Sequence, residues 1–133
     1  MARLQLGQTL HDCLTIGAHW SRLIANVQSA WSNLQLEHDD EAAAHLRQAG
    51  DAWKILHDTF YPYLKPQQRE FIDPLHLWMT KIIDHTQLKI SEGSPKEWVK
   101  KTLRELLQKI NERGAGSIED LIYELCKQTG GGA

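Results

Sequence analysis

The chain has 133 residues, of which 41% are hydrophobic and 24% are charged, and its formal net charge at pH 7 is −2. A chain of this length can bury a core of its own, so we expect one globular domain over residues 1–133. The slightly acidic balance argues against a protein that binds nucleic acid through bulk positive charge. No apolar run approaches the roughly 20 residues of a membrane span, and the first residues lack the apolar stretch of a secretory signal. We therefore expect a cytoplasmic protein without a membrane segment.

Residues 1–36 predict one long helix that forms the spine of a helical bundle. Only Arg3, Asp12 and Arg22 carry a formal charge in this segment, and the other polar side chains are neutral. An unbroken heptad seam predicts the face that packs along the bundle. The uncharged second face suggests that this helix also lies against another molecule. The seam, in steps of three and four residues, consists of Leu6, Leu10, Cys13, Gly17, Trp20, Ile24, Val27, Trp31 and Leu34.

The second predicted helix starts in the acidic run over residues 37–41, which suits the positive end of a helix dipole. Gly50 within it marks a bend or a close helix crossing. Residues 66–72 predict a short helical turn, and Asp73 with Pro74 predicts the start of a third helix that reaches about Ile90. The core-facing stripe of the second helix is Leu46, Ala49, Trp53, Leu56 and Phe60.

The last two helices have clear start signals. Ser94, Pro95 and Glu97 predict a capping box for a helix whose core stripe is Val99, Leu103, Leu106, Leu107 and Ile110. Ser117 and Asp120 predict a second box that opens a short final helix, followed by a flexible Gly-rich tail over residues 129–133. No segment has the alternation of a strand. The fold class that we expect is an all-α, single-domain bundle of about five helices with short connections.

Cysteine and tryptophan usage bears on packing. Cys13 and Cys126 lie in apolar helix stripes, which favours two reduced core cysteines, with a disulfide between the two ends of the chain as the alternative. Five tryptophans are many for this length. We expect core packing to explain three or four of them, which leaves one or two as exposed anchors for a partner.

The sequence does not contain the usual signals of a catalytic or metal site. Neither His-x-x-x-His nor Glu-x-x-His occurs, and the nearest pair is Glu41 with His45. No nucleophile elbow or phosphate-binding loop is present. We therefore expect no metal, no cofactor and no catalytic residue.

One spacing is shared with an enzyme family. Arg69 and His76 are separated by six residues, which resembles the Arg-x(4–6)-His signature of the helical HEPN ribonucleases. The resemblance implies a dimer that joins two such pairs and cleaves RNA by metal-free acid–base chemistry. The simpler interpretation is a surface arginine and a histidine at a helix start. We keep the ribonuclease as the less favoured alternative.

The fourth predicted helix is basic. Residues 95–113 hold six basic and three acidic side chains, and Lys96, Lys100 and Arg104 follow one another at steps of four residues. Together with Lys101, these residues are our candidate nucleic-acid-binding site, because such a row can follow a phosphate backbone and release its counterions. The alternative is a solvated face with its own ion pairs, such as Lys101 with Glu105.

In size, helix pattern and this basic helix, the chain resembles the small subunits of CRISPR effector complexes. The resemblance implies a non-enzymatic subunit that self-associates, contacts larger protein subunits and touches the backbone of RNA or DNA through Lys96, Lys100, Lys101 and Arg104. The alternative from a different class is a homo-oligomeric interaction or adaptor bundle that is joined through the first helix and binds no nucleic acid.

Overall fold

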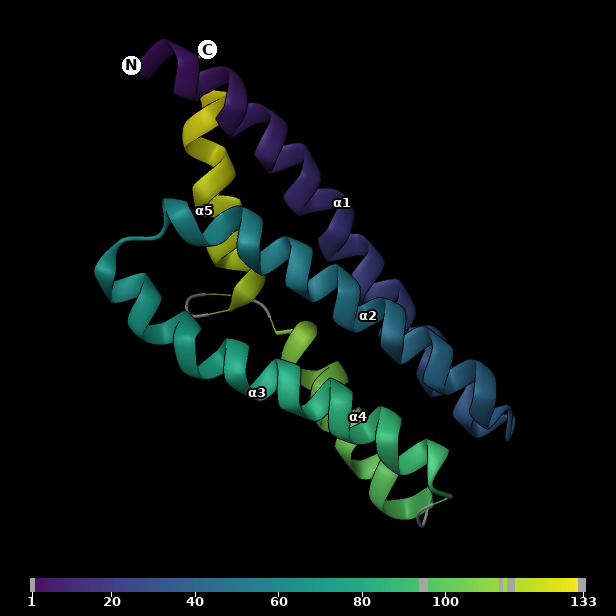
Figure 1. Cartoon of the computed structure of the whole chain (residues 1–133). Helices are drawn as coiled ribbons and strands as arrows, with labels where there is room; N and C mark the ends of the chain where they lie inside the picture. The colour runs from purple at the N-terminus through teal and green to yellow at the C-terminus, as the bar shows by residue number, and fades with distance from the viewer. Residues whose placement is uncertain (1, 94–95, 113, 115–116, 132–133) are drawn as a thin grey trace.

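The computed structural model describes residues 2–93, 96–112, 114 and 117–131, and it confirms the all-α bundle (Figure 1). Within these residues there is no β-strand. No helix among them is both long enough and apolar enough to cross a membrane. The elements are α1 (Ala2–Gln35), α2 (Asp39–Phe60), the 3₁₀ turn η1 (Tyr61–Tyr63), α3 (Pro66–Ser91), α4 (Lys96–Ile110) and α5 (Ile118–Gly131).

Four of the helices surround one core. α1 packs along α2, α2 on α3, α3 on α4, and α4 returns to α1. α5 packs against α1 near the end of the molecule where both chain termini lie (Figure 1). Each of α1 to α4 therefore has two neighbours within this four-helix layer and one face that points away from it, and α1 also contacts α5.

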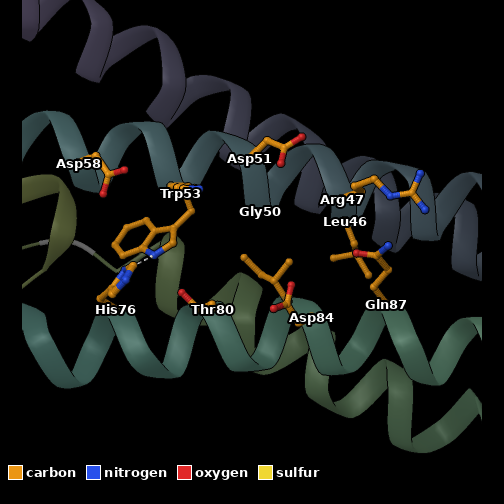
Figure 2. A pocket seen from close by; sticks show the side chains of 12 residues that line it. Leu46, Arg47, Gly50, Asp51, Trp53, Asp58, His76, Thr80, Asp84 and Gln87 are labelled. Atoms are coloured by element: carbon orange, nitrogen blue, oxygen red, sulfur yellow. Dashed lines mark hydrogen bonds between the residues drawn. The ribbon is translucent and has the colours of Figure 1, made fainter.

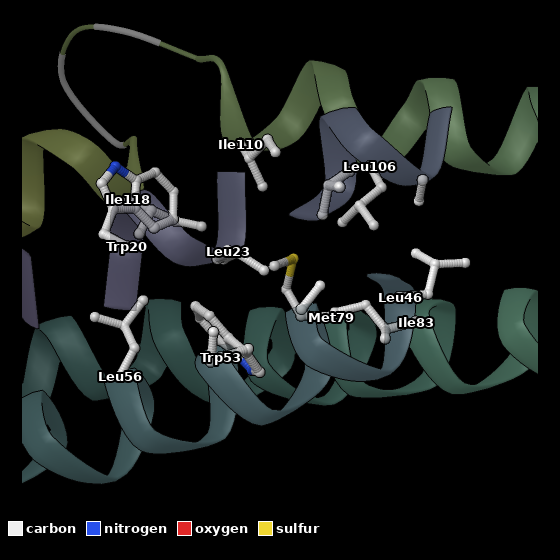
Figure 3. Close-up of a cluster of buried hydrophobic side chains, with 14 of the residues drawn as sticks. Trp20, Leu23, Leu46, Trp53, Leu56, Met79, Ile83, Leu106, Ile110 and Ile118 are labelled. Carbon is white, nitrogen blue, oxygen red and sulfur yellow. The ribbon is translucent and has the colours of Figure 1, made fainter. Parts of the chain in front are cut away.

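The core joins side chains from all five helices, as Figure 3 shows. The predicted stripe of α2 is confirmed, since all five of its residues are buried. In α4, the predicted stripe is also confirmed, with only Leu107 half-buried. Among the core residues labelled in Figure 3 are Trp20, Leu23, Leu46, Trp53, Leu56, Met79, Ile83, Leu106, Ile110 and Ile118.

The seam of α1 is rotated relative to the prediction. Trp20, Val27 and Leu34 are buried as expected, but Leu10 is 52% exposed and Gly17 is also exposed. The other core row consists of Ile16, Leu23 and Ala30. A heptad spacing fits two adjacent rows of α1 equally well. Packing against α2 decides that the row with Ile16, Leu23 and Ala30 is the buried one. Asn26 also lies on the buried side of α1. Because it is polar, it interrupts the apolar pattern by which this row could be recognised in the sequence.

Two further features of α2 and α3 concern glycine and proline. A Cβ atom on Gly50 would lie 3.3 Å from Cγ2 of Ile83, so Gly50 marks a close crossing of α2 and α3.

The predicted break before Pro74 is wrong, because α3 runs without interruption from Pro66 to Ser91. An interior proline costs about 3 kcal/mol. Burial of Ile72 and Leu75 on either side of Pro74 opposes that cost.

The ends of α4 and α5 agree in part with the prediction. Ser94 and Pro95 lie outside the described residues. Ser117 is confirmed as an N-cap, since its Oγ accepts a hydrogen bond from the backbone N–H of Asp120 at 3.0 Å. α5 continues to Gly131, whereas the sequence predicts a tail from residue 129, and residues 132 and 133 lie outside the described part of the chain.

The prediction of two reduced cysteines is wrong. Cys13 and Cys126 form a disulfide between α1 and α5, with their Cα atoms 5.6 Å apart. Sequence reasoning favoured reduced thiols because both residues lie in apolar stripes. It could not show that those two stripes meet.

The tryptophans follow the expected division. Trp20 and Trp53 are buried, and Trp31 and Trp78 are half-buried against the core. Trp98 is 40% exposed. Core packing therefore explains four of the five, and Trp98 is the exposed one.

Candidate nucleic-acid interface

The predicted basic residues lie on the surface of α4, away from its core stripe. Lys100 is half-buried, and Lys101 and Arg104 are exposed. Lys96 is the first residue of α4, and its side chain lies outside the described residues. Because Lys100 and Arg104 are one helical turn apart, their side chains lie one above the other at the edge of α4 that faces α1.

The charges of Lys100, Lys101 and Arg104 are not neutralised by a carboxylate in the described ranges of the chain. In the part of the chain that the structure describes, Lys100, Lys101 and Arg104 form no ion pair with a carboxylate. The predicted pair of Lys101 with Glu105 is not formed, and Lys109 pairs with Glu112 at 3.3 Å. This surface of α4 therefore keeps a net positive charge that ion pairs within the helix do not cancel.

An aromatic side chain lies beside the cations. The Arg104 guanidinium carbon lies 5.6 Å from the centre of the Trp31 ring, which is a cation–π distance. Trp31 belongs to α1, whose exposed residues on this side, such as Gln28, are uncharged. Cations of this kind can hold a phosphate, and a partly exposed aromatic ring beside them can stack on a base. The sequence predicts the packing of Trp31 against the core, but it does not predict the contact with Arg104, which depends on how α4 lies on α1.

A second candidate site lies between α2 and α3 (Figure 2). It is a pocket of about 420 Å³, within the range of small-molecule sites. Its floor includes Leu46, Trp53 and Ile83. The remaining lining residues are polar or charged, apart from Gly50: Arg47, Asp51, Lys54, Asp58, His76, Thr80, Asp84 and Gln87.

A pair of histidines forms one end of this pocket region. The Trp53 indole N–H donates a hydrogen bond to Nδ1 of His76 at 3.0 Å, as Figure 2 shows. The His57 and His76 rings stack with their centres 3.7 Å apart. Burial, followed by the charge of His57, lowers the pKa of His76, so its neutral form is favoured. With Nδ1 accepting, the proton of neutral His76 is on Nε2.

The two residues of the ribonuclease-like spacing both have other contacts. His76 is held by Trp53 and His57, and the Arg69 guanidinium carbon lies 4.9 Å from the centre of the Tyr61 ring. The Tyr61 hydroxyl donates a hydrogen bond to Asp73 at 2.9 Å. These contacts explain His76 by packing against α2 and Arg69 by packing against η1, and the ribonuclease stays a prediction. No group of three potential metal ligands occurs among the described residues.

Comparison with known proteins finds no relative of this chain: no protein-family model, no curated protein and no solved structure matches it.

Proposed function

We propose that this protein is a non-enzymatic helical subunit of a larger nucleoprotein assembly, of the kind formed by the small subunits of CRISPR effector complexes. It contacts the nucleic-acid backbone through Lys96, Lys100, Lys101 and Arg104. The observation that carries this proposal is that Lys100, Lys101 and Arg104 have no carboxylate partner among the residues that the structure describes.

The physical basis is the release of counterions. A cation that is already paired with a carboxylate gains little from a phosphate, whereas an unpaired one displaces a condensed counterion. Trp31 beside Arg104 adds a surface for base stacking. Backbone contacts and stacking carry little sequence information, so the protein should bind without strong sequence preference and gain its specificity from other subunits.

The test is binding of the full chain to a labelled single-stranded RNA and to a duplex DNA by fluorescence anisotropy over a range of salt concentrations. We expect Lys100→Glu combined with Arg104→Glu to weaken binding by about tenfold or more and to reduce the salt slope by about 2. The matched control is Lys54→Glu with Lys81→Glu, which makes the same charge change on α2 and α3, where both lysines are exposed. Equal losses in the two double variants would contradict a specific interface on α4.

A second candidate function is a protein-interaction bundle that needs no nucleic acid. The observation that favours it is the face of α1 that points away from the bundle, where Leu10 is 52% and Leu14 is 69% exposed. If wild-type protein binds neither nucleic acid while it forms a defined oligomer, this second function replaces the first.

A further inference from the structure

One face of α1 points away from the bundle and carries no charge over most of the length of the helix. We call it the outer face of α1. From Leu10 to Gln35 it is about 38 Å long, at 1.5 Å per residue. It consists of Leu10, Leu14, Gly17, Ala18, Ser21, Ala25, Gln28, Ser32 and Gln35, all of which are exposed.

A face of this composition is unusual for a helix that is solvated on its outer side. Such faces normally hold charged side chains, which keep the surface soluble. Here the centre of the face is formed by Gly17, Ala18, Ser21 and Ala25, so the backbone of another helix can approach closely. The leucines at one end supply apolar area, since Leu14 is 69% exposed.

The outer face is flanked by opposite charges on its two sides. On the α4 side lie Lys100 and Arg104, and the stacking of Arg104 on Trp31 fixes their level along α1. On the α2 side lie the exposed Glu41 and, about two turns of α1 further towards its N-terminus, the half-buried Arg22.

Glu41 lies at the same level along α1 as Arg104. The ring of His45 contacts the Asn26 side chain at 2.8 Å, and the His38 N–H donates to the Asn33 carbonyl, also at 2.8 Å. Because Glu41 falls between His38 and His45 in α2, it lies beside α1 between Asn33 and Asn26. That stretch of α1 includes Trp31.

We infer that a second copy of this chain docks on the outer face of α1 and forms a parallel, two-fold symmetric homodimer. A two-fold axis parallel to α1 places the α4 side of one protomer opposite the α2 side of the other. Lys100 and Arg104 then meet the partner's Glu41, twice per dimer. In an antiparallel pairing over the same face the two α4 sides face each other, so Lys100 and Arg104 do not meet the partner's Glu41 and both sets of ion pairs are lost. An uncharged face also meets its own copy without repulsion.

This inference goes beyond the nucleic-acid proposal and does not rest on it. The two share Lys100 and Arg104, which cannot fully engage a phosphate backbone and the partner's Glu41 at once. The single substitutions that weaken the dimer are therefore placed on α1 and α2 and leave both cations in place, and the cations are changed only in the charge-reversal rescue.

The first experiment measures the oligomeric state of the full chain by analytical ultracentrifugation at micromolar concentrations. We expect wild-type protein to have twice the 15.2 kDa mass of one chain. Ala25→Glu and Leu14→Glu, which place a charge on the outer face, should each weaken dimerisation by about tenfold or more. Leu77→Glu is the matched control on α3, where Leu77 is 56% exposed, and it should leave the dimer intact. A monomeric wild-type protein, or equal effects of all three variants, would overturn the inference.

The second experiment tests the parallel orientation by charge reversal. Glu41→Lys places like charges opposite each other in the parallel dimer, so we expect about a tenfold loss of dimer affinity. Adding Lys100→Glu and Arg104→Glu to that variant should restore the affinity. If Glu41→Lys has no effect while Ala25→Glu separates the protomers, the parallel arrangement is wrong. Glu41→Lys should not reduce RNA binding, so failure of the dimer and failure of the nucleic-acid proposal are distinguishable.

Discussion

At the scale of single residues, Trp53 links the core to the histidine pair. Its indole is only 1% exposed, and it makes its hydrogen bond to His76 at the edge of the pocket between α2 and α3. A buried indole N–H needs an acceptor, and neutral His76 provides one. A protonated His76 has no acceptor nitrogen, and its charge lies against the stacked ring of His57.

This arrangement predicts that acid destabilises the protein. The pKa of His76 is lowered from 6.5 in the folded state, so the unfolded state binds the proton more readily. The stability that this group contributes is complete above pH 6.5 and is lost as the pH falls through the lower, folded pKa. Urea unfolding at about pH 7.5 and about pH 5 should therefore show a lower free energy of unfolding in acid. His76→Gln should reduce that pH dependence, and His38→Gln at an exposed position should not. Equal dependence in wild type and His76→Gln would contradict the assignment.

At the scale of helices, the sequence allowed most of the fold to be predicted and failed where two helices meet. Helix starts depend on local hydrogen bonds, so Ser117 could be recognised as a cap from its neighbours in the chain. The rotation of α1 and the continuity of α3 through Pro74 depend on packing against other helices. The surface position of Lys100, Lys101 and Arg104 could be predicted from spacing and charge, whereas the contact of Arg104 with Trp31 could not, because it depends on how α4 packs on α1.

A comparison of two helical glycines, Gly17 and Gly50, tests how closely α2 packs on α3. Replacing a helical glycine by alanine normally stabilises a protein by about 0.5–1 kcal/mol. Gly17→Ala should show this gain, because a Cβ atom there meets nothing within 4 Å. Gly50→Ala should gain less or lose stability, because its Cβ would press on Ile83 at 3.3 Å. Chemical unfolding of dilute, monomeric protein compares them, and equal gains would show that α2 and α3 do not cross closely.

At the scale of the whole molecule, the disulfide between Cys13 and Cys126 holds α5 against α1. A hydrogen bond from the Tyr63 hydroxyl to Asp12 adds a contact between η1 and the same part of α1. Disulfides persist mainly in oxidising compartments, and the cytoplasmic location expected from the sequence stays a prediction. The disulfide also makes the attachment of α5 dependent on redox conditions.

Reduction of this disulfide should lower stability markedly. The two cysteines are 113 residues apart, and a disulfide that closes so long a loop removes much entropy from the unfolded chain. We expect reductant to lower the free energy of unfolding by about 2–5 kcal/mol, which calorimetry would detect as a lower Tm. Cys13→Ser combined with Cys126→Ser should melt at that lower temperature whether or not reductant is present. Two titratable thiols in unreduced protein would contradict the disulfide.

The same bond turns most of the polypeptide into a covalent ring that contains α2, α3 and α4 entire. A protease that nicks the ring once, for example between α2 and α3, leaves both fragments joined. The nicked molecule would migrate near its full mass on a non-reducing gel and separate into two pieces only after reduction. The connections between these helices can therefore be cut without the release of either part.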